Sequence, residues 1–77
     1  MEKFAVELIL RPNNTPVENI KAAVIEFAET VDIVDYPEDD PENPGSIKIS
    51  LVTHDPTVIF DACGQFGKIK NVKIKEV

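Results

Sequence analysis

This chain is poor in cysteine and lacks both a long apolar run and a signal sequence. Cys63 is its only cysteine, which excludes an internal disulfide framework and a cysteine-based metal site. No apolar run approaches the roughly 18 residues that a membrane-spanning helix needs. The first ten residues lack the basic region, apolar segment and small-residue cleavage site of a signal peptide. We therefore expect a cytoplasmic protein with no membrane partner.

Basic charge is scarce outside the C-terminal end. The formal net charge is −6, and four lysines with one glutamate give residues 68–77 a charge of +3, which leaves −9 for residues 1–67. A mostly acidic surface repels a phosphate backbone. Residues 46–53 contain no aromatic side chain on which a base could stack. We therefore expect no nucleic-acid partner.

The length of 77 residues predicts one domain, residues 1–77, near the size at which a single core is only marginally stabilising. Association would bury additional surface, and the acidic and basic regions complement each other. We therefore expect a homodimer or another protein partner, bound through an edge strand or an open sheet face. Contacts of this kind weaken as salt is added.

The first half of the chain reads as a strand followed by a helix. Residues 3–11 alternate with a period of two, and both faces are partly apolar, which is typical of a central strand. Thr15 and Pro16 then match an N-cap and a first helical residue, and a glutamate three residues after the cap completes a capping box. The helix predicted from Pro16 carries one apolar stripe: Ile20, Ala23, Val24, Phe27, Ala28 and Val31.

The second half predicts two strands, a helix and a last strand. The first of these strands (residues 31–36) leads into an exposed turn rich in proline and acids, which the next strand follows. Asp55 and Pro56 repeat the cap-then-proline signal. The helix there has the stripe Ile59, Ala62, Cys63 and Phe66, and residues 68–77 form a strand with lysines toward solvent.

The element order β-α-β-β-α-β is that of the ferredoxin-like fold of the α+β class. This order predicts a four-stranded antiparallel sheet in which the first and third strands are central. Both helices then cover one face. The other face is left to water or to a partner, and its predicted side chains are Ala5, Glu7, Lys48, Ser50, Lys73 and Lys75.

A loop before the first helix is the candidate ligand-binding site. A guanidinium, two carboxamides and the N–H groups of a helix N-terminus favour an anion there, which predicts a small carboxylate or amino-acid ligand. The alternative is that the cap already satisfies those N–H groups and that the asparagines only form a tight turn. The residues predicted to bind are Arg11, Asn13, Asn14 and Thr15.

Other reactive residues favour structural roles. His54 and Asp55 are adjacent and could act as a catalytic base with the acid that orients it. Asp55 is better explained as a helix cap. Cys63 fits an apolar stripe, and no His or other Cys lies at the spacing from it that a metal-binding motif has. The lysines of residues 68–77 suit either an anion site or a protected sheet edge. We predict no catalytic residue, no metal, no cofactor and no enzymatic activity.

Two segments of the chain resemble ACT-type regulatory domains and the NIL domains of the same broad group. Arg11-Pro12 through Ile33-Val34 is similar to the first half of ACT domains, and Gly45 through Ile49 with Val72-Lys73-Ile74 is similar to the second half of NIL domains. The resemblance implies a regulatory module that binds an amino acid between paired domains, near the first strand-to-helix loop. The chain has Asn13-Asn14-Thr15 where a glycine usually follows the Arg-Pro pair. The alternative function is a protein–protein interaction domain without a small ligand.

Overall fold

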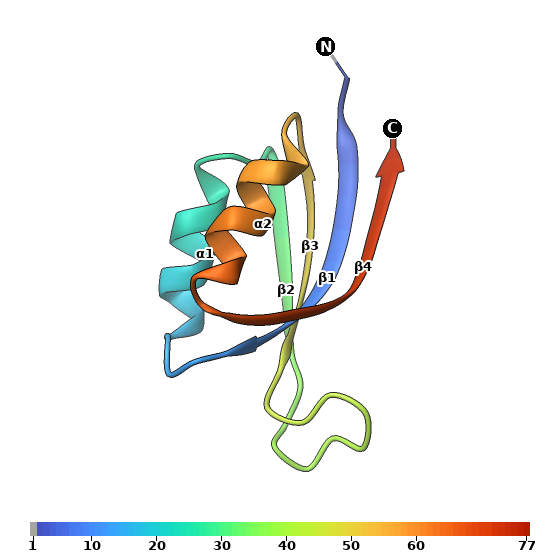
Figure 1. Cartoon of the computed structure of the whole chain (residues 1–77). Helices are drawn as coiled ribbons and strands as arrows, with labels where there is room; N and C mark the ends of the chain where they lie inside the picture. The colour runs from blue at the N-terminus through green and yellow to red at the C-terminus, as the bar shows by residue number, and fades with distance from the viewer. Residues whose placement is uncertain (1) are drawn as a thin grey trace.

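The computed structural model describes residues 2–77, and in them the predicted element order is confirmed. The four strands form one antiparallel sheet in the order β2-β3-β1-β4. Both helices lie on the same face of this sheet (Figure 1), as in the ferredoxin-like fold. The elements are β1 (Phe4–Pro12), α1 (Val17–Ile25), β2 (Thr30–Asp35), β3 (Ile47–Thr53), α2 (Pro56–Gly64) and β4 (Gly67–Glu76).

The hydrophobic core lies between the two central strands and the helices. In β1 and β3, alternate side chains point toward the helices, because successive side chains of a strand face opposite sides of a sheet. Each helix contributes two fully buried side chains to the same core. The buried apolar residues of this cluster are Val6, Leu8, Leu10, Ile20, Val24, Ile47, Ile49, Leu51, Ile59 and Cys63.

The predicted capping box at the start of α1 is wrong. Pro16 occupies the N-cap, and no side chain accepts a hydrogen bond there. Asn14 has a left-handed backbone with φ of 60°, and the turn directs the Thr15 hydroxyl toward the carbonyl of Asn13 at 3.5 Å. The carbonyl of Pro16 instead accepts the first helical hydrogen bonds, from the N–H groups of Asn19 and Ile20.

The predicted apolar stripe of α1 does not continue as a helix beyond Val24, although Ala28 still packs against the core. The helix ends at Ile25, and the N–H of Phe27 donates to the carbonyl of Val24 as the last turn tightens. The Phe27 side chain is therefore outside the core and 47% exposed. Val31 lies in β2, where it packs against the core from the sheet.

The second helix agrees with its sequence signals. The Asp55 carboxylate accepts a 3.1 Å hydrogen bond from the N–H of Thr57, and Pro56 begins the helix. This is the arrangement in which an N-cap satisfies one of the free N–H groups of a helix start. Ile59 and Cys63 are buried on the face that meets the sheet.

β4 forms an outer edge of the sheet and contains a bulge. Its pairing with β1 shifts between the pairs Glu7–Lys73 and Ile9–Lys70, and Asn71 in the bulge has φ of 55°. The predicted exposure of the lysines is confirmed. The exposed turn between β2 and β3 lies at one end of the sheet (Figure 1), where the Lys70 ammonium donates to the carbonyl of Glu42 at 3.4 Å.

Candidate functional site

Three rows of side chains cross the face of the sheet that the helices leave uncovered. Residues paired across an antiparallel sheet point to the same side, so the strand registers define each row. Across β2, β3, β1 and β4, the first row is Thr30, Val52, Ala5 and Lys75, the second is Asp32, Ser50, Glu7 and Lys73, and the third is Val34, Lys48, Ile9 and Lys70.

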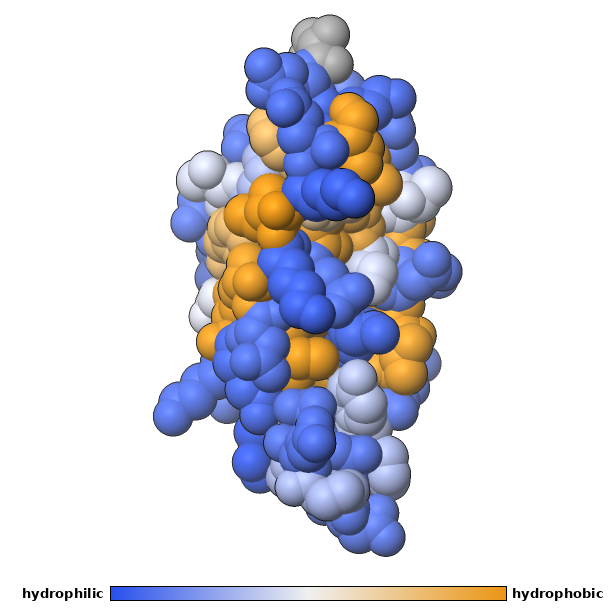
Figure 2. Space-filling model, turned by 90° about the vertical axis from the view of Figure 1, so that its right-hand side faces the viewer, coloured by the Kyte–Doolittle hydropathy of each residue, from blue (hydrophilic) through white to orange (hydrophobic). Residues whose placement is uncertain are grey.

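A groove of about 360 Å³ lies over the first two rows. Its floor is formed by short side chains, those of Ala5, Ser50 and Val52, which leave space between the longer chains of the outer strands. Figure 2 views the molecule from the side opposite the helices, where apolar surface lies on both sides of a band of polar side chains. The volume is in the range of small-molecule sites.

The charges of the groove lie on two neighbouring strands and one distant strand. The ammonium Nζ of Lys73 is 4.0 Å from Oε1 of Glu7. Lys73 is largely exposed and Glu7 is partly exposed, so this ion pair is weak. Lys75 lies beside Lys73 on the same face. Asp32 is three strand spacings from Lys73, or about 14 Å, and within residues 2–77 no partner lies within ion-pair distance of it.

The predicted site at residues 11–15 lies apart from the groove. Arg11 is exposed and pairs with Lys68 of β4, about 13 Å along β1 from Glu7. The Asn13 N–H donates a 2.6 Å hydrogen bond to the carbonyl of Phe66, which attaches the loop to the end of α2. Asn13 and Asn14 are exposed and Thr15 is half-buried. None of these side chains lines the groove, and ligand binding by the loop stays a prediction.

His54 does not form a catalytic pair with Asp55. The imidazole Nδ1 lies 2.8 Å from the carbonyl of Glu2, and Nε2 lies 3.7 Å from the carboxylate of Glu29. Asp55 caps α2 instead, as the sequence favoured. Within residues 2–77 no three His, Cys, Asp or Glu side chains lie together as a metal site would require.

Cys63 is a buried apolar contact of α2. Its side chain is fully inaccessible, and burial raises the pKa of the thiol to about 11. A thiol must ionise before it acts as a nucleophile. Cys63 is therefore inert in the folded protein at neutral pH.

The sequence predicted which side chains share the helix-free face but not the groove itself. The signal for the groove is one small side chain on the helix-free face of each central strand, Ala5 on β1 and Ser50 on β3. That signal has meaning only once the register between strands is known.

No helix in residues 2–77 has the length and apolarity needed to cross a bilayer. No family model, curated protein or solved structure matches this chain.

Proposed function

We propose that the protein is a non-catalytic binding module of the ACT/NIL-like regulatory type, and that its ligand is a small amino acid with an aliphatic side chain. The observation that supports this proposal is the groove on the helix-free face. It combines a neighbouring ammonium and carboxylate, Lys73 and Glu7, with a floor that is mostly apolar.

The charges of an α-amino acid match those of the two neighbouring strands. Its carboxylate would bind the ammonium groups of Lys73 and Lys75, and its ammonium would bind the carboxylate of Glu7, as charge-assisted hydrogen bonds. An aliphatic side chain would then lie along the first row, over Ala5 and Val52. The distant Asp32 is too far away to take part in the same contact.

A non-catalytic role agrees with the chemistry of the groove. General acid–base or nucleophilic catalysis needs a reactive group held within hydrogen-bond reach of a second one. The groove has the hydroxyl of Ser50 in the row of Glu7 and Asp32. The histidine and the thiol of the chain, His54 and Cys63, do not line it. The groove therefore offers ligand recognition by charge and shape.

A backbone amide chemical-shift titration tests the proposal. Leucine should shift the amides of Ala5, Glu7, Ser50 and Lys73. Isocaproate lacks the ammonium group and isoamylamine lacks the carboxylate, so both should bind more weakly. Shifts at residues 11–20 would place the site at the predicted loop instead. No shifts with millimolar leucine would contradict the small-ligand function and favour the second candidate, a protein–protein interaction domain.

One observation favours that second candidate. Val72 and Ile74 lie on the outer strand β4 with 44% and 49% of their surface exposed. Exposed apolar side chains gathered on an unpaired strand are typical of a surface that binds another polypeptide.

A further inference from the structure

The outer edge of β4 is unpaired and has two chemically different sides. In the part of the chain that the structure describes, no strand lies beyond it in the sheet (Figure 1). Ile74 pairs with the core residue Val6, so its side chain points to the helix side, and alternation places Val72 there as well. The helices do not extend over these two side chains, which are half exposed.

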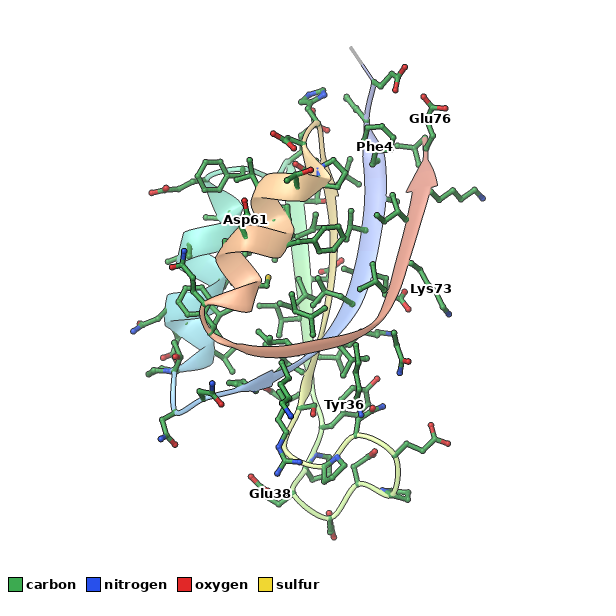
Figure 3. The ribbon with its side chains drawn as sticks, in the orientation of Figure 1. Phe4, Tyr36, Glu38, Asp61, Lys73 and Glu76 are labelled. Carbon is green, nitrogen blue, oxygen red and sulfur yellow. The ribbon has the colours of Figure 1, made fainter. Side chains whose placement is uncertain are left out.

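The other side of β4 is basic. Lys73 and Lys75 pair with Glu7 and Ala5, which lie on the helix-free face. Figure 3 shows the Lys73 side chain projecting from β4 away from the helices. The edge therefore presents apolar side chains toward the helix side and ammonium groups toward the other side.

β2, at the opposite edge of the sheet, has the complementary pattern. Val31 and Ile33 pair with core residues of β3 and so point to the helix side. Thr30 and Asp32 point to the helix-free face, and both are exposed. Over residues 30–33 this edge presents apolar side chains toward the helix side and a carboxylate toward the other side, whereas Val34 and Asp35 reverse the pattern at the end of the strand.

We propose that β4 of one copy pairs with β2 of a second copy and continues the sheet. β2 and β4 run antiparallel in the sheet, so a copy placed beside the first in the same orientation makes an antiparallel contact. With Lys73 opposite Asp32, Ile74 lies opposite Val31 and Val72 lies opposite Ile33. A shift by one residue would set apolar side chains against charges on both faces.

Charge selects this pairing over the symmetric ones. Pairing of β4 with β4 sets lysines against lysines, and pairing of β2 with β2 sets Asp32 near its own copy. Directly opposed like charges destabilise a strand pair. The lysines thus disfavour pairing of β4 with a second β4, as edge lysines do. They favour pairing of β4 with β2, which carries Asp32.

The two edges are different surfaces, so the contact is heterologous and leaves a free edge at each end. Such assembly forms open chains unless the rotation closes them into a ring. The pairing uses Lys73 and Asp32, which also line the groove, but it does not need a ligand there.

Sedimentation velocity with two edge variants tests the proposal. Ile74→Lys blocks β4, and Asp32→Lys blocks β2. Wild type should form oligomers of increasing size at high micromolar concentration and low salt, and fewer at about 1 M salt, where the Debye length is about 3 Å. Each variant alone should stay monomeric. Their mixture should form a complex of two copies, because one competent edge of each kind remains.

Asp61→Lys is the matched control, since Asp61 is exposed on α2 (Figure 3) and the change in charge equals that of Asp32→Lys. This variant should associate like wild type. Amide spectra of each variant establish that it is folded. A monomeric wild type under the same conditions, or a mixture of folded edge variants that stays monomeric, would overturn the proposal. So would either edge variant associating as well as wild type, which would place the contact elsewhere.

Discussion

The Thr53 hydroxyl at the end of β3 donates a 2.6 Å hydrogen bond to the carbonyl of Phe27, 26 residues earlier in the chain. The same oxygen accepts a 3.1 Å bond from the N–H of Asp55. Thr53 is buried, so one hydroxyl joins the turn after α1, the end of β3 and the start of α2.

Thr53→Val should lower the free energy of unfolding by about 1–3 kcal/mol, because the replacement keeps the shape but removes two part-buried hydrogen bonds, to the carbonyl of Phe27 and from the N–H of Asp55. Denaturant unfolding of both proteins measures this difference. Thr53→Ser keeps the hydroxyl and serves as the control. A valine variant as stable as the serine variant would show that the hydroxyl bond is not needed.

Gly67 and Gly64 should respond in opposite ways to alanine. A Cβ at Gly67 would overlap the carbonyl of Arg11, and Pro12 pairs with Gly67 at the end of β4. Gly67→Ala should therefore cost about 1–3 kcal/mol, as overpacking does. Within residues 2–77, and apart from its chain neighbours and the backbone of its own helix, a Cβ at Gly64 would meet nothing within 4 Å, so Gly64→Ala should stabilise by about 0.4–1 kcal/mol. Equal melting temperatures for the two variants would contradict the pairing of Gly67.

Asp55 and Thr15 form a matched pair of cap positions. Asp55→Ala removes an observed cap and should cost about 1 kcal/mol. Thr15→Ala removes only a long, exposed hydrogen bond and should change the stability by less than about 0.5 kcal/mol, as other surface substitutions do. Chemical denaturation compares the two variants. A larger loss for Thr15→Ala would restore the capping box that the sequence suggested.

Substitutions of Ile20 and Phe27 distinguish the observed end of α1 from the predicted one. Ile20 is fully buried and Phe27 is half exposed. Ile20→Ala should cost about 2–5 kcal/mol, and Phe27→Ala should cost less than that, because part of its ring already contacts water. Thermal and urea unfolding give both values. The reverse order would mean that the helix continues through Phe27.

The fold could be predicted because period-two strands and apolar helical stripes record which face of each element is buried. Local geometry was less predictable. Thr15-Pro16 and Asp55-Pro56 carry the same signal, but only Asp55 caps, because the left-handed Asn14 turns the chain before Thr15. The apolar periodicity of the sequence also continues beyond Ile25, where α1 ends.

The groove was beyond prediction for a different reason. Its residues come from four strands, and their alignment depends on three registers. One of these registers shifts at a bulge near Asn71, and a single asparagine inside a β-rich run does not by itself predict a bulge. The predicted loop from Arg11 to Thr15 is continuous in the chain and so was visible, whereas the groove is assembled from distant segments.

The most direct test of the binding function is the affinity of leucine for wild type, Glu7→Gln and Arg11→Ala, measured by titration calorimetry. Glu7→Gln removes the carboxylate that would bind the ligand ammonium and should weaken binding about tenfold, the equivalent of about 1.4 kcal/mol for a charged hydrogen bond. Arg11→Ala changes the predicted loop and should leave the affinity unchanged. Unchanged binding by Glu7→Gln together with a loss in Arg11→Ala would contradict the groove and place the ligand at the loop.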